Sequence, residues 1–190
     1  MQSDVFFTKH TFGTVQKPLL ILELANNHNG SVPHGKHIID LAAEAVAGLG
    51  FTAAIKFQYR DLDSLIHPSY KGDFSFKYIK RFEETRLSDE QFLELIDHAR
   101  KKGFLVACTP FDEASVGKII EHKFDFLKVA SAYSTDWPLL TKVVEAEMPT
   151  IVSTGGLGVR DLDRSVVFLS KRLQKLALMH CVAVYPTPDD

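Results

Sequence analysis

The chain has 190 residues, of which 45% are hydrophobic and 24% charged, and its 22 basic and 24 acidic side chains give a formal net charge of -2. This composition excludes a disordered chain, a collagen-like chain and a small disulfide scaffold, and it fits one domain across residues 1–190. Because the charges nearly balance, neither nucleic acid nor an anionic membrane is expected as a partner. Any anion therefore needs a local site.

The cysteines and the N-terminus indicate where the protein works. Cys108 and Cys181 lie far apart in apolar segments, which is typical of reduced core thiols in a cytoplasmic protein. The N-terminus lacks the basic and apolar regions of a signal peptide, and no uninterrupted apolar run of about 18 residues occurs. The sequence therefore predicts a cytoplasmic protein without a membrane span.

Short apolar runs alternate with segments of helical period, which is typical of repeated βα units. Such near-continuous apolar strands indicate a parallel sheet covered by helices. Eight units would make a closed barrel and five or six an open doubly wound sheet, and the pattern alone does not choose between them. Strands are predicted at residues 20–24, 53–57, 104–108, 126–130, 150–154 and 176–180.

The segments between these strands have the period of amphipathic helices. In the first, Ile38, Leu41, Ala42 and Ala45 are expected to share the buried face. Helices are predicted at residues 37–50, 87–103, 112–122, 135–146 and 160–172.

Local signals refine this pattern. Ser88 and Gln91 have the spacing of a capping box, and Pro138 fits the first turn of a helix. The stretch from Tyr59 to Arg86 breaks the rhythm, because it is nearly thirty residues long and rich in aromatic and charged side chains. We expect it to be a long functional loop.

Polar side chains follow every predicted strand at the point where the strand ends. In a parallel α/β architecture these ends meet at one edge, where sites form. The polar residues and the glycines beside them are Glu23, Asn26, Asn27, His28, Lys56, Gln58, Thr109, Asp112, Lys128, Ser131, Ser153, Thr154, Gly155, Gly156, His180 and Tyr185.

Two lysines suggest what these strand ends bind. A lysine in a buried strand is costly unless its ammonium meets an anion, and Lys56 and Lys128 both occupy such positions. Hydroxyls at Ser131 and Ser153 and the glycine turn at 155–156 could donate hydrogen bonds to a phosphate. The expected ligand is a small phosphorylated acid.

Each of these features also has a purely structural interpretation. A lysine near a strand end can reach solvent, Glu23 can form a structural ion pair with Lys56, and residues 153–156 can be an ordinary turn. His180 beside Cys181 fits a core histidine better than a ligand. Five other histidines are expected at the surface: His34, His37, His67, His98 and His122.

Six segments resemble, in order and spacing, the sialic acid synthase family, which includes N-acetylneuraminate, legionaminic acid and pseudaminic acid synthases. The similarity covers roughly residues 15–188. The segments are ELANNHNG (23–30), IKFQ (55–58), CTPFDEASV (108–116), LKVASA (127–132), VSTGG (152–156) and LMHCVAVYPTP (178–188).

The resemblance implies a (β/α)8 TIM barrel, of which this chain holds about the first six βα units. It implies condensation of phosphoenolpyruvate with an N-acetylmannosamine-type sugar, giving a nine-carbon 2-keto sugar acid and phosphate, with a divalent metal, usually manganese. Glu23, Gln58 and Tyr185 match positions around the reacting centre and the sugar, with His28 nearby. The positions that match phosphoenolpyruvate-binding residues are Lys56, Thr109, Lys128, Ser131 and Ser153.

The chain departs from the family pattern at three points. Tyr133 stands where relatives usually have a glutamate, and Ala183 where they have an asparagine. The family's two metal-binding histidines lie downstream of the Y-P-T-P motif, so no metal ligand is expected within residues 1–190. The chain is therefore expected to be an incomplete N-terminal portion of an enzyme that is a homodimer at full length.

Two other functions stay open. The first is a noncatalytic barrel that binds phosphoenolpyruvate or another anion and lacks the metal site. The second is a different phosphoenolpyruvate aldolase-like barrel, for example one that uses a phosphorylated sugar.

Overall fold

Six parallel strands follow one another in the same order in the chain and in the sheet, β3-β4-β5-β6-β7-β8. The protein is seen in a computed structural model that describes residues 7–8, 11–12, 18–184 and 187–188. A doubly wound sheet would reverse its strand order at a switch point, whereas a barrel adds each strand beside the last. The strands are β3 (Leu19–Glu23), β4 (Thr52–Tyr59), β5 (Leu105–Pro110), β6 (Phe126–Val129), β7 (Thr150–Ser153) and β8 (Leu176–Met179).

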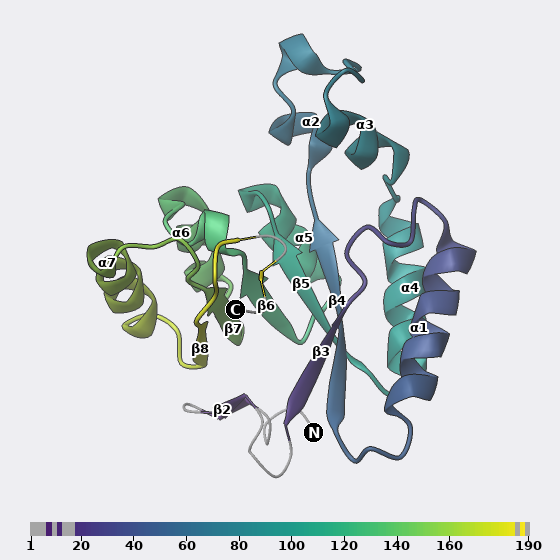
Figure 1. The fold of residues 1–190 in the computed structure, drawn as a ribbon, viewed down its shortest axis with the longest axis horizontal. Coiled ribbons are helices and arrows are strands. Elements are labelled where there is room, and N and C mark those ends of the chain that lie inside the picture. Colours follow the sequence, from purple (N-terminus) through teal and green to yellow (C-terminus); the bar gives the residue numbers. More distant parts are fainter. Residues whose placement is uncertain (1–6, 9–10, 13–17, 185–186, 189–190) are drawn as a thin grey trace.

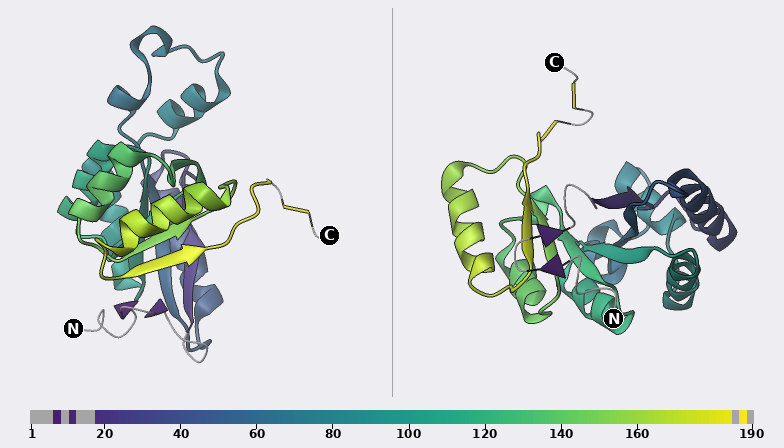
Figure 2. Two further views of the ribbon diagram at one scale, coloured as in Figure 1. Left: turned by 90° about the vertical axis from the view of Figure 1, so that its left-hand side faces the viewer. Right: turned by 90° about the horizontal axis from the view of Figure 1, so that it is seen from below.

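The sheet is curled, with its helices on the outer side (Figures 1 and 2). This is part of a TIM barrel, as the resemblance implied, and all six predicted strands are confirmed. A two-stranded antiparallel hairpin, β1 (Phe7–Thr8) with β2 (Thr11–Phe12), lies near the N-terminus. The helices that alternate with the strands are α1 (Val32–Val46), α4 (Asp89–Lys101), α5 (Glu113–Glu121), α6 (Trp137–Glu145) and α7 (Val159–Ser170). Among the described helices, none has the length and apolar character needed to cross a membrane.

Helix starts follow local capping chemistry. The capping box at α4 is confirmed: the Ser88 hydroxyl accepts from the Gln91 amide, and the Gln91 side chain accepts from the Ser88 amide. Pro138 lies in the first turn of α6, also as predicted. Helix α1 begins five residues earlier than the predicted 37–50, because Ser31 caps its first turn.

The predicted buried face of the first helix is partly wrong. Ile39 is fully buried, while Leu41 is 50% exposed. The buried face runs instead through Val32, Gly35 and Ile39, so the packing against the sheet and not the apolar pattern alone selects the buried stripe.

The stretch from Tyr59 to Arg86 is not the long loop that was predicted. It contains α2 (Leu62–Leu65), the short 3-10 helix η2 (Pro68–Tyr70) and α3 (Lys77–Glu84). Figure 1 shows α2 and α3 standing beyond the end of β4, away from the helices that cover the sheet. The stretch forms a helical projection over the edge where the strand ends meet.

Two apolar clusters lie on opposite faces of the sheet. The outer cluster includes Phe57 of β4 and packs against the helices. The inner cluster, on the concave face, consists of Ala54, Ala107, Phe126 and Ile151. Successive side chains of a strand alternate between these faces, so the inner cluster fixes which residues point into the barrel.

Candidate functional site

The inner cluster leads directly to the site. Because side chains alternate along a strand, the residue two positions after each member of that cluster lies on the same inner face, one layer nearer the strand's C-terminal end. These residues are Lys56, Thr109, Lys128 and Ser153.

Lys56 is only 8% exposed and has two polar partners. Its Nζ donates a hydrogen bond to Thr109 Oγ1 at 3.0 Å and forms an ion pair with the carboxylate of Glu23. Glu23 is directly opposite Lys56 in the β3–β4 register, and its Oε1 also accepts from the Ala25 amide at 3.1 Å. The predicted Glu23–Lys56 pair is therefore present, and it keeps a buried ammonium at the strand ends.

Lys128 supplies the second ammonium of the site. Burial lowers the pKa of this lysine, and the positive charge of Lys56 lowers it further. Both lysines lie on the inner face, at the ends of β4 and β6, the two strands that flank β5. Glu23 is the carboxylate that offsets them, which leaves an excess of positive charge for an anionic ligand.

Two serines and a glycine complete this cluster. Ser131 Oγ accepts a hydrogen bond from the Gly155 amide at 3.1 Å, which joins the end of β6 to the turn after β7. Ser153 is buried, and its hydrogen bond with Cys181 lowers the pKa of that thiol; the Ser131 side chain and the Lys128 charge act in the same direction. The sequence-predicted residues of β6 and β7 are thus brought together around Cys181.

Gln58 lies at the other side of the site, opposite Thr109 in the β4–β5 register. Its Oε1 accepts a hydrogen bond from Arg60 Nη2 at 2.8 Å. The Arg60 guanidinium lies 3.7 Å from the ring centroid of Phe111 and 4.4 Å from that of Phe82. Burial lowers the pKa of this arginine.

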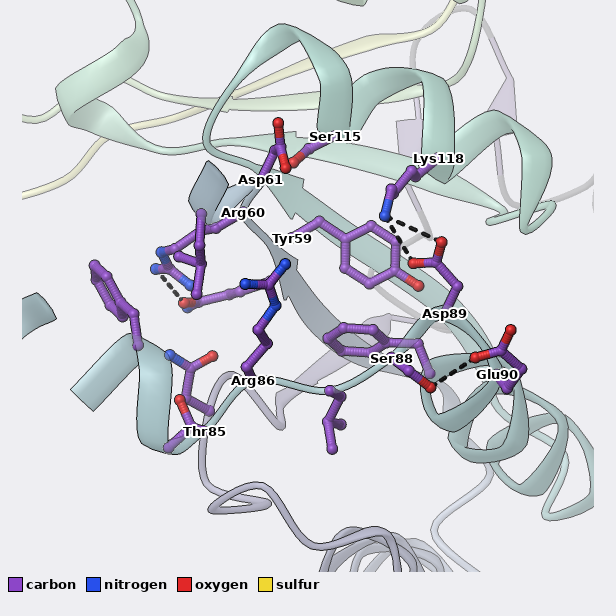
Figure 3. Close-up of a pocket in the computed structure, with 16 residues that line it drawn as sticks. Tyr59, Arg60, Asp61, Thr85, Arg86, Ser88, Asp89, Glu90, Ser115 and Lys118 are labelled. Atoms are coloured by element: carbon purple, nitrogen blue, oxygen red, sulfur yellow. Dashed lines mark hydrogen bonds and ion pairs between the residues drawn. The ribbon is translucent and has the colours of Figure 1, made fainter. Parts of the chain in front are cut away.

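A cavity of about 550 Å³ adjoins Gln58 beneath the helical projection. Figure 3 shows Arg60 and Arg86 on one side of it and the Lys118–Asp89 ion pair, with an N–O distance of 2.8 Å, on the other. Asn26 also lines the cavity. The cavity therefore connects the strand ends with the helical projection.

His28 is buried, and its described contacts are with Gly30 and Phe92. Its Nδ1 accepts a hydrogen bond from the Gly30 amide at 3.2 Å, and its ring meets Phe92 edge-on at a centroid distance of 6.1 Å. Burial, with the charges of His34 and Arg81, lowers its pKa from 6.5 to about 4. A catalytic role for His28 stays a prediction. Tyr185 lies outside the described residues.

Two histidine expectations are wrong. His122 is not at the surface: it is 5% exposed, and its Nδ1 lies 2.8 Å from the hydroxyl of Tyr59. A buried tyrosine hydroxyl needs a polar partner, which explains why this histidine is inside. His180 is exposed rather than a core histidine, since it follows the edge strand β8.

The positions that depart from the family pattern also have defined contacts. Tyr133 packs perpendicular to Phe111 at a centroid distance of 5.3 Å, so it extends the aromatic support of Arg60. Ala183 Cβ lies 3.5 Å from where a side chain at Gly156 would begin. Both departures therefore border the site.

Sequence reasoning missed Arg60, Phe82 and Cys181. Arg60 had a usable signal, since it follows Gln58 by two residues at the end of β4. Phe82 had none, because its ring reaches Arg60 from α3, a helix that the sequence pattern did not reveal.

The fold and site together define one class of protein: a βα barrel whose inner strand ends carry paired lysines and hydroxyls suited to an anion. The chain belongs to the NeuB family, whose sequence profile matches residues 38–190. This confirms the resemblance to the sialic acid synthases.

Individual relatives agree with this assignment. The chain is 48% identical to a protein assigned as spore coat polysaccharide biosynthesis protein E from Chromobacterium violaceum, with a TM-score of 0.88 over 92% of this chain and 52% of that one. It is 26% identical to the N-acetylneuraminic acid synthetase of Leptospira borgpetersenii serovar Hardjo-bovis, with a TM-score of 0.75 over 90% and 56%. It is 28% identical to the N,N'-diacetyllegionaminic acid synthase of Campylobacter jejuni over 92% and 54%. The chain thus spans about half the length of these relatives.

Proposed function

We propose that this chain forms the phosphoenolpyruvate-binding part of an enzyme that condenses phosphoenolpyruvate with an N-acetylmannosamine-type sugar. The product is a nine-carbon 2-keto sugar acid, and phosphate is released. The observation that carries the proposal is the placement of two lysines, Lys56 and Lys128, on the inner face at the ends of β4 and β6. The names of the Leptospira and Campylobacter relatives support the reaction class.

The chemistry assigns a task to each group. Lys56 and Lys128, with the hydroxyls of Thr109, Ser131 and Ser153, hold the carboxylate and phosphate of phosphoenolpyruvate. Fixed charges of this kind stabilise charge that develops in the transition state without reorganising. C3 of phosphoenolpyruvate bonds to the aldehyde carbon of the sugar, water adds at C2, and the C2–O bond breaks, so the phosphate leaves with the bridging oxygen.

Glu23 and Gln58 face the second substrate in this proposal. The Glu23 carboxylate is 43% exposed beside Lys56, so it can orient water or move a proton at C2. Gln58 lines the cavity of about 550 Å³, which is wide enough for a sugar. We also propose that Tyr185 lies near the sugar. The full-length enzyme is proposed to be a homodimer.

The resemblance also implies a divalent metal, usually manganese. Within the described parts of the chain, no three His, Cys, Asp or Glu side chains lie together as a metal site requires. These residues alone do not fit the ion.

The experiment is turnover by the intact protein with phosphoenolpyruvate that carries ¹⁸O at the bridging position. We expect phosphate release that depends on an N-acetylated sugar, with the label in the phosphate. A panel that includes phosphorylated sugars identifies the acceptor. Label retained in the keto acid would contradict the proposed bond cleavage. Binding of phosphoenolpyruvate without turnover on any sugar would favour the noncatalytic anion-binding barrel.

A further inference from the structure

The Arg60 guanidinium contacts two aromatic rings and donates a hydrogen bond to one side chain, that of Gln58. The guanidinium lies 4.4 Å from the ring centroid of Phe82 and 3.7 Å from that of Phe111, and its Nη2 donates to Gln58 Oε1 (Figure 3, dashed line at Arg60). Two cation–π contacts restrict the orientation of a planar guanidinium. The hydrogen bond therefore has a fixed donor.

That fixed donor determines how the Gln58 amide is oriented. An amide has one oxygen, which only accepts, and one NH₂ group, which only donates, while a guanidinium has no acceptor. The atom of Gln58 that faces Arg60 must therefore be the oxygen, and the NH₂ group must point elsewhere. Gln58 lies between Arg60 and the Lys56–Thr109 pair, at the border of the cavity.

We infer that Arg60 is a positioning residue, which holds Gln58 with its NH₂ group available to donate to an oxygen of the acceptor sugar. The inference rests on the proposed function and names a residue that serves it. The support comes from three separate segments, because Phe82 belongs to α3, Phe111 follows β5, and Tyr133 follows β6 and packs on Phe111. The helical projection thus acts on the site through Arg60.

The kinetic test is a double-mutant cycle in the intact protein. We expect Arg60→Met and Gln58→Leu each to raise KM for the sugar about tenfold, since the first releases the Gln58 amide from its orientation and the second removes the NH₂ donor. The double variant should be no worse than Gln58→Leu alone. Arg60→Lys, which keeps the charge, should recover part of the loss. Phosphoenolpyruvate affinity should stay within about twofold in all of them, a split that a general packing defect would not give.

Arg172→Met is the matched control, because Arg172 also lies over an aromatic ring, Phe168 of α7, at 4.2 Å, but it follows the end of that helix. It should leave KM for the sugar unchanged. Additive losses in the Arg60–Gln58 double variant would overturn the inference.

A second readout does not depend on turnover. In a protein labelled with ¹⁵N at glutamine, the Gln58 side-chain NH₂ signals should differ from those of exposed Gln174, and Arg60→Met should move them toward the Gln174 values. Unchanged Gln58 signals in that variant would contradict the inference. If the wild-type protein has no synthase activity, the proposed function fails, while this measurement still decides the role of Arg60.

Discussion

The two thiols show how environment sets the chemistry of single residues. Burial raises the pKa of the Cys108 thiol well above its ordinary value, whereas the hydrogen bond with Ser153 lowers that of Cys181. The thiolate is the reactive form, so we predict that iodoacetamide near neutral pH modifies Cys181 first. Because Cys181 contacts the anion site, phosphoenolpyruvate should slow the reaction.

Mass spectrometry of the alkylated protein checks this prediction. Cys181→Ser should abolish the fast phase, and Cys108→Ser should leave it intact. Equal labelling of both thiols in the folded protein would show that the predicted difference in reactivity does not exist.

The lowered pKa of His28 makes the free energy of unfolding depend on pH. Its folded-state pKa of about 4 lies below the ordinary 6.5, so the unfolded chain binds the proton more readily between these values. Stability that is present above pH 6.5 is therefore lost as pH falls toward 4, by about 3 kcal/mol at most. Urea unfolding at several pH values should show a smaller loss for His28→Gln than for wild type. The exposed His37→Gln is the control, and a loss as large in His28→Gln as in wild type would refute the assignment.

At the scale of the element, the turn between β7 and α7 has little room for a side chain. A Cβ at Gly155 would lie 3.0 Å from Ser131 Oγ and 3.1 Å from Cys181 Cβ. We predict that Gly155→Ala displaces Ser131 and weakens phosphoenolpyruvate binding about tenfold by calorimetry. Gly117→Ala is the control, because nothing lies within 4 Å of a Cβ there. Equal affinities for the two variants would mean that this turn does not shape the site.

The elements also show what the sequence could predict. Apolar runs located all six strands, and the rule that sites form at strand ends located Lys56, Lys128 and their hydroxyl neighbours. Period alone misplaced the start of α1, since the cap at Ser31 and not the apolar stripe begins that helix. The helices α2 and α3 were missed because they are short and bury little: Leu62 is the buried residue of α2, and α3 has none.

Side-chain contacts between distant segments account for the remaining misses. Arg60 acquires its role only through rings from α3 and from the segment after β5, and His122 is buried only because Tyr59 reaches it. Neither contact leaves a trace in local composition. The identity of the strand-end residues was predictable, but the supports that orient them were not.

For the whole molecule, the sheet has two edges, β3 and β8. On β8, Leu178 and Met179 are each 45% exposed, so apolar surface accompanies a strand that, in the described sheet, pairs only with β7. We predict that residues 1–190 expressed alone have marginal stability and associate. Sedimentation and calorimetry check this, and a cooperative high-temperature melt of a monomer would contradict it.

Lys56 and Lys128 at the strand ends are proposed to bind phosphoenolpyruvate together. The most direct test is calorimetric titration of phosphoenolpyruvate into the intact wild-type protein, Lys128→Ala and Lys171→Ala, with Lys171 as an exposed lysine at the end of α7. We expect Lys128→Ala to weaken binding at least tenfold, because it removes a half-buried ammonium that meets the anion, and Lys171→Ala to match wild type. Equal affinities for the two variants would contradict the account.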